Sequence, residues 1–105
     1  MFPDREKAFE EKWAHDEELR FKVLARRNKM LGLWAAGEQG LKGAAAETYA
    51  KALIAAELTR EGDEAVFKKL KADFAAAKIA RTDHLLRLKM DEFLAAAKHE
   101  VMHED

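Results

Sequence analysis

The chain has 105 residues and no cysteine, 37% of its residues are charged, and its formal net charge is −1 at pH 7. This near balance of charge argues against a dedicated nucleic-acid binder, and the lack of cysteine excludes disulfides, thiol nucleophiles and thiolate metal sites. No apolar run reaches membrane-spanning length and the first residues lack the apolar core of a signal peptide, so we expect a single-domain cytoplasmic protein without direct membrane insertion.

The first element is a long helical pattern that covers residues 4–36. It contains no proline, its only glycine is Gly32, and Asp4 is the expected N-cap. At about 1.5 Å per residue such a helix reaches about 50 Å, roughly twice the length of any later helical segment. A compact body can cover only part of it. We therefore expect residues 1–18 to form a flexible or extended N-terminal helical arm.

Phe9 and Trp13 are the only large apolar residues within residues 4–18. They lie four residues apart and so share one helical face, but two aromatic side chains cannot keep a short isolated helix folded in water. Either they pack back onto the body, or they are aromatic anchors for a partner groove that accepts an amphipathic helix. The high charge and low hydrophobicity of this segment favour the second alternative, because such segments fold on binding.

Three shorter helices are predicted after a glycine-rich loop at residues 37–43. Residues 44–61 form the second helix, Asp63 is the expected cap of the third, and Thr82 is the expected cap of the fourth. Apolar residues at three-to-four spacing mark the buried faces of the last two helices: Val66, Phe67, Leu70, Phe74, Leu86, Met90, Phe93, Leu94, Ala97 and Val101. With no strand pattern, four helices and short connections predict an all-α antiparallel four-helix bundle over residues 19–105.

One motif near the C-terminus matches a catalytic metal site. His99, Glu100 and His103 are spaced as H-E-x-x-H, in which two histidines on one helical face bind zinc and the glutamate activates a water. Only Glu104 and Asp105 follow as a third ligand, and helix ends fray. We therefore expect no metal and no cofactor, and a zinc metallopeptidase is the least favoured function.

Arg26, Arg27 and Lys29 form a basic cluster on the first predicted helix. Such a cluster is either a solvated face that complements nearby acidic residues or a docking surface for an acidic protein partner. A nucleic acid fits poorly, because the preceding segment is acidic and no aromatic residues alternate with the basic ones.

The first third of the chain also carries a family resemblance. Three runs closely resemble the zeta subunit of the alphaproteobacterial F-type ATP synthase: Asp4-Arg5-Glu6-Lys7-Ala8-Phe9-Glu10, Lys12-Trp13-Ala14-His15-Asp16 and Ala25-Arg26-Arg27-Asn28-Lys29-Met30-Leu31-Gly32-Leu33-Trp34-Ala35-Ala36-Gly37. The resemblance covers nearly the whole chain, the third run is its most specific part, and the last quarter matches only in pattern.

The resemblance implies a regulatory protein, not an enzyme, that inhibits ATP hydrolysis by the catalytic head of the ATP synthase. Its N-terminal segment would insert as a helix between alternating catalytic and non-catalytic subunits, near the central rotor stalk, and block rotation. The protein would be cytoplasmic, a monomer when free, and peripheral at the inner membrane when it is bound to the ATP synthase. The implied partner-binding residues come from the arm and its junction with the body: Asp4, Arg5, Glu6, Phe9, Glu10, Lys12, Trp13, His15, Asp16, Arg26, Arg27 and Lys29.

Two further hypotheses follow from the arm. Acidic neighbours favour the charged form of His15, so we expect low pH to alter binding of the arm. An exposed amphipathic arm also suits a helical adaptor that self-associates, and this is the alternative function.

Overall fold

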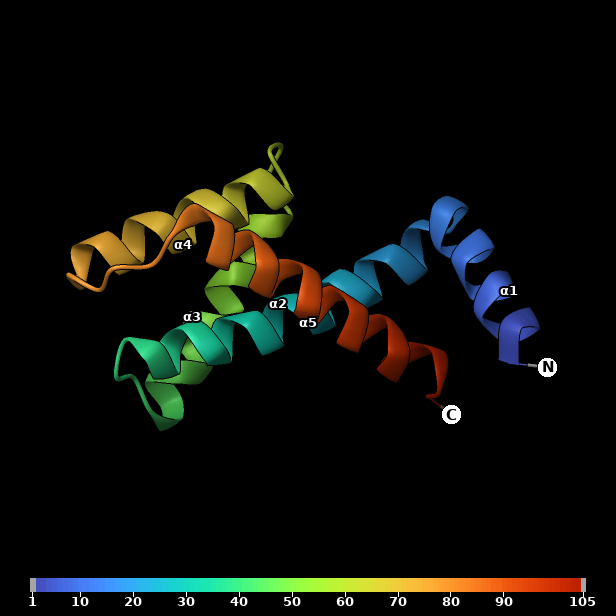
Figure 1. Cartoon of the computed structure of the whole chain (residues 1–105), viewed down its shortest axis with the longest axis horizontal. Helices are drawn as coiled ribbons and strands as arrows, with labels where there is room; N and C mark the ends of the chain where they lie inside the picture. Colours follow the sequence, from blue (N-terminus) through green and yellow to red (C-terminus); the bar gives the residue numbers. More distant parts are fainter. Residues whose placement is uncertain (1, 105) are drawn as a thin grey trace.

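The computed structural model describes residues 2–104, with side chains described for residues 4–104 (Figure 1). Five helices follow one another along the chain: α1 (Phe2–His15), α2 (Glu17–Glu38), α3 (Gly43–Glu57), α4 (Asp63–Ala76) and α5 (Asp83–Met102). The described residues contain no strand, which confirms the all-α prediction. None of these helices is long and apolar enough to cross a membrane.

Helix α2 is the element around which the body is built. It packs against α3 and α5, while α4 packs against both α3 and α5. Their facing stripes form the main core, which consists of Leu31, Ala35, Leu53, Val66, Phe67, Leu70, Phe74, Leu86 and Met90. Helix α1 contacts the N-terminal part of α2 and lies at the end of the molecule where both termini are found (Figure 1).

The contact between α2 and α3 depends on a glycine inside a helix. A β-carbon added to Gly32 would lie 2.5 Å from the α-carbon of Ala50, so only glycine permits this backbone approach. Glycine inside a helix costs about 1 kcal/mol relative to alanine. The close packing of α2 on the buried Ala50, which a larger residue would prevent, offsets that cost.

The prediction of one continuous helix over residues 4–36 is wrong, because the helix breaks at Asp16. This residue has an extended backbone (φ −100°, ψ 108°), and its carboxylate accepts a hydrogen bond of 3.1 Å from the backbone N–H of Leu19. Aspartate is a favoured N-cap, and acidic residues in the following turn stabilise a helix start. Asp16 therefore begins α2. Asp4, the predicted N-cap, lies instead in the first turn of α1.

The other helix boundaries agree in part with the sequence. Thr82 caps α5 as predicted, since its hydroxyl accepts a hydrogen bond of 3.0 Å from the N–H of Leu85. Helix α3, however, ends at Glu57 rather than at residue 61. Gly62 occupies the N-cap position of α4, and Asp63 is the first residue of the helix, where its carboxylate pairs with Arg27.

Candidate functional site

Helix α1 rests on the body through a small apolar contact that we call the α1 seat. The seat consists of Val23, Ala97 and Val101, with Leu19, Met30 and Leu94 packed around them. Phe9 and Trp13 pack against this cluster and are each half-buried. Among the described side chains, none from α1 belongs to the main core. Of the two alternatives for the aromatic pair, the structure shows the one in which they pack back onto the body.

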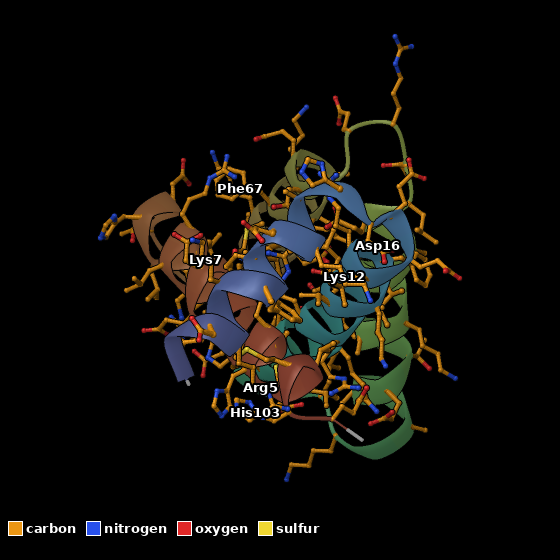
Figure 2. The ribbon with its side chains drawn as sticks, turned by 90° about the vertical axis from the view of Figure 1, so that its right-hand side faces the viewer. Arg5, Lys7, Lys12, Asp16, Phe67 and His103 are labelled. Carbon is orange, nitrogen blue, oxygen red and sulfur yellow. The ribbon has the colours of Figure 1, made fainter. Side chains whose placement is uncertain are left out.

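Polar contacts near the surface supplement the seat. Arg5 donates a hydrogen bond of 3.0 Å to the carbonyl of Met102, near His103 at the end of α5 (Figure 2). The ammonium of Lys98 lies 3.4 Å from a carboxylate oxygen of Glu10 and 4.5 Å from the ring centre of Trp13. Exposed ion pairs contribute about 0–1 kcal/mol each, so these contacts orient α1 more than they hold it.

A cavity of about 580 Å³ separates much of α1 from α5. Helix α1 contributes Glu6, Phe9 and Glu10 to its lining, and α5 contributes Asp91, Leu94, Ala95, Lys98, His99 and Met102. The two helices therefore face each other across a hollow as well as through side-chain contacts. Such a contact has little of the dispersion energy of a closely packed core.

The remaining predicted arm residues lie on or beside the exposed side of α1. Asp4, Glu6, Lys12 and His15 are exposed, and Lys12 lies 3.9 Å from the carboxylate of Asp16 across the junction with α2 (Figure 2). Asp16 is half-buried because its carboxylate is used as the N-cap. Asp4, Glu6, Lys12 and His15 are thus accessible to solvent on the helix.

The predicted basic cluster does not form one surface. Arg26 donates to Glu100 at 3.1 Å and to Glu104 at 2.5 Å, which ties α2 to the end of α5. Hydrogen bonds from Arg26 and Lys22 lower the pKa of Glu104 to about 2. Lys29 is exposed and forms no ion pair with the described residues. Arg26 thus complements nearby acidic residues, as the first alternative expects, while Lys29 is exposed to solvent.

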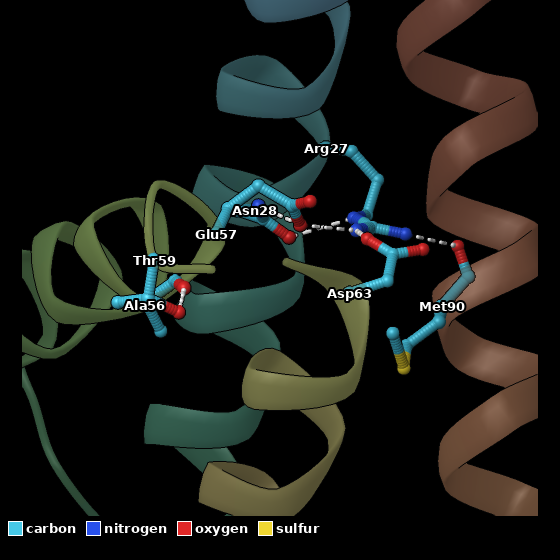
Figure 3. A network of polar contacts seen from close by, with 7 residues as sticks. All are labelled: Arg27, Asn28, Ala56, Glu57, Thr59, Asp63 and Met90. Atoms are coloured by element: carbon cyan, nitrogen blue, oxygen red, sulfur yellow. Dashed lines mark hydrogen bonds and ion pairs between the residues drawn. The ribbon is translucent and has the colours of Figure 1, made fainter. Parts of the chain in front are cut away.

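Arg27 is the clear exception to the prediction of a basic surface, because it is only 1% exposed. Its guanidinium pairs with Glu57 at 3.1 Å and with Asp63, and it donates to the carbonyl of Met90 at 3.5 Å (Figure 3). It also donates to Asn28, whose amide in turn donates to Glu57 at 3.1 Å. This polar network joins α2, the end of α3, the start of α4 and the middle of α5.

In this network one arginine faces two carboxyls, Glu57 and Asp63, and their pKa values shift in opposite directions. Burial, together with a hydrogen bond that the protonated Glu57 donates to Asp63, raises the pKa of Glu57 to about 7. Burial acts in the same direction on Asp63, but the hydrogen bond with Glu57 and the charge of Arg27 outweigh it and lower the pKa of Asp63. Sequence reasoning missed this network, although Arg27 lies on the same helical stripe as the buried Val23 and Leu31.

Comparison with known families decides the assignment. The family ATPase inhibitor subunit zeta matches residues 1–100. The chain belongs to this family. Zeta subunits are regulatory inhibitors rather than enzymes, which confirms both the resemblance and the prediction that this chain is not an enzyme. No curated protein matches the chain.

The H-E-x-x-H match gains no support from the geometry of this zeta subunit. His99 and His103 are exposed, with ring centres 4.3 Å apart, and Nδ1 of His103 lies 2.9 Å from the carbonyl oxygen of His99. Within the described part of the chain, no group of three or more His, Asp or Glu side chains is placed to hold a metal ion. The motif is a solvated last turn of α5.

Proposed function

We propose that this zeta subunit inhibits ATP hydrolysis by the F-type ATP synthase through α1, which leaves its seat and inserts as a helix between catalytic and non-catalytic subunits. The observation that carries the proposal is the weak attachment of α1, which is a separate helix held by one small apolar cluster and by polar contacts near the surface. Family membership supplies the inhibitory role, and the seat supports α1 as the mobile part.

The break at Asp16 allows α1 to move without damage to the body. Because the carboxylate of Asp16 caps α2 at Leu19, the start of α2 is satisfied by its own residues. Rotation about residues 15–17 then breaks no hydrogen bond within α2 beyond its cap. The junction is therefore a hinge.

The energetics of exchange favour a partner that buries the aromatic pair completely. Full burial of a large apolar side chain contributes about 1.5–3 kcal/mol, and Phe9 and Trp13 are only half-buried in the seat. A groove between subunits that covers both faces of α1 buries the rest of these two side chains and gains the remaining free energy of burial. The exposed Arg5, Glu10 and Lys12 then fix the register through charge-assisted contacts.

The body acts as a tether for the inserted helix. Docked on the outside of the catalytic head, it keeps α1 at high effective concentration near its groove. A helix trapped in a closing interface blocks rotation in the hydrolytic direction, whereas rotation in the synthetic direction opens the interface and releases it. Inhibition is therefore expected to act on hydrolysis alone.

The test is a reversible lock of α1 on α5. The chain has no cysteine, so Glu10→Cys with Lys98→Cys provides two unique thiols at an existing contact, and a reducible bis-maleimide can bridge them. We expect the bridged chain to inhibit hydrolysis at least about tenfold less and to recover on reduction, since each 1.4 kcal/mol of lost contact is a factor of ten.

The control for the lock is the same double variant with each thiol capped separately, which changes both side chains but leaves α1 free. It should inhibit like the reduced protein. Equal inhibition by the bridged and capped forms would show that α1 does not need to leave its seat.

A further inference from the structure

A second apolar feature lies away from the α1 seat, on the outer face of α2 and α3. Among the described residues, three large hydrophobic side chains are exposed: Phe21 (54%), Leu58 (62%) and Leu88 (43%). Two of them, Phe21 and Leu58, line the same cavity of about 120 Å³, which we call the Phe21–Leu58 pocket. Its other lining residues are Leu24, Ala25, Asn28, Ile54 and Glu57.

The folded chain does not itself use this pocket. A single exposed leucine needs no explanation, but two large apolar side chains at one hollow with aliphatic walls are typical of a contact surface. The pocket lies where the first half of α2 faces the end of α3, beyond the close approach at Gly32 and Ala50. The α2–α3 contact therefore leaves Phe21 and Leu58 uncovered.

The floor of the pocket is acidic. Glu57 is the only ionisable residue that lines it, and its side chain is 13% exposed. Behind it, the single Arg27 faces both Glu57 and Asp63 and is itself buried. When both carboxyls are ionised, two carboxylates against one arginine leave an excess of one negative charge, so a cation is the complementary group.

We infer that the Phe21–Leu58 pocket is a docking site for a protein partner that places an arginine or lysine over Glu57 and an apolar side chain between Phe21 and Leu58. The inference rests on the proposed function, which makes this partner the catalytic head of the ATP synthase. Phe21 follows the hinge at Asp16 by five residues, about 8 Å along α2. A partner that holds α1 thus also reaches the pocket, which would supply part of the tether.

The titration of Glu57 gives the proposal a second observable. The groups that face it are Arg27 on α2 and Asp63 on α4, and Arg87 on α5 acts on Asp63. Because burial raises the pKa of Glu57, an incoming cation has to stabilise its ionised form, so the affinity should be several-fold higher at pH 8 than at pH 6. Glu57→Gln, which mimics the protonated form, should remove this difference.

The experiment measures the dissociation constant of the full chain for the purified catalytic head. We expect Phe21→Ser and Leu58→Ser each to weaken binding about tenfold, as truncation of a buried apolar anchor does. Leu88→Ser is the matched control, because it removes the third exposed hydrophobic residue from α5 and should bind like the unmodified chain. Thermal melting of each variant confirms that it is folded.

Several outcomes overturn the inference. If both pocket variants bind the catalytic head with unchanged affinity, the docking inference is wrong, while the proposed inhibition through α1 is unaffected. A concentration-dependent dimer that sedimentation detects in the unmodified chain and not in Phe21→Ser would assign the pocket to a second copy instead. No binding of the unmodified chain to the head would overturn both this inference and the proposed function.

Discussion

The α1 seat and the polar network around Arg27 are both built on α2, yet they join the chain in different ways. The network connects four helices through a guanidinium that is almost fully buried, and it lies against Met90 of the main core. The seat connects one helix through half-buried aromatic residues beside a large cavity. The first arrangement fixes the body as one unit, whereas the second leaves α1 able to separate from it.

The largest expected effect comes from removing the centre of the network. Arg27→Ala leaves Glu57 and Asp63 without their shared cation, and breaking a buried ion pair typically costs 3–5 kcal/mol. We expect about 3 kcal/mol in the free energy of unfolding measured with urea, near the low end because Asp63 is half exposed. The neighbouring Arg26→Ala is the control and should cost less than about 1 kcal/mol. Similar losses for the two variants would contradict the role given to Arg27.

The second prediction concerns pH and the same network. The folded-state pKa of Glu57 is raised above its ordinary value, so between pH 4.5 and about 7 the folded chain retains a proton that the unfolded chain has lost. Stability should therefore fall as the pH rises through this window, by up to about 3 kcal/mol, and level off above it.

Glu57→Gln provides the control for this titration, because it should flatten the dependence on pH between 4.5 and 7. The lowered pKa of Asp63 acts with the opposite sign, but only below the ordinary range of an aspartate. Urea unfolding at several pH values measures both effects. A stability of the unmodified chain that rises from pH 5 to pH 7 would be contrary to the account.

The smallest expected effect on folding comes from the seat. Trp13→Ala should lower the free energy of unfolding by about 1 kcal/mol or less, since the ring is half-buried and outside the main core, whereas Leu31→Ala should cost about 3 kcal/mol. The order should be reversed for inhibition of hydrolysis. Trp13→Ala should weaken inhibition about tenfold or more, and Leu31→Ala should weaken it less. A Trp13→Ala variant that is unstable yet fully inhibitory would contradict this prediction.

The sequence predicted the helical class and the cap at Thr82, because spacing and capping are local properties. It did not predict the break at Asp16, since no glycine or proline interrupts the pattern there. The signal was nevertheless present: Asp16 is followed by Glu17 and Glu18, an N-cap and an acidic first turn. A helix start can thus interrupt a helical pattern without a glycine or proline.

The candidate site was predictable only in part for a different reason. The aromatic pair on one face of α1 was visible from its spacing, but whether it packs on the body depends on where α5 ends in space. The pairing of Arg27 has no local signal because its partners, Glu57 and Asp63, lie 30 and 36 residues further along the chain. The Phe21–Leu58 pocket has no local signal, since it arises from the spacing of α2 and α3.

Amide hydrogen exchange of the free chain tests most directly whether α1 is attached separately from the body. The account predicts that amides around Phe9 and Trp13 exchange through a local opening of low free energy, while those at Leu31 and Leu70 exchange only with global unfolding. Protection of α1 as strong as that of Leu31 and Leu70 would contradict it.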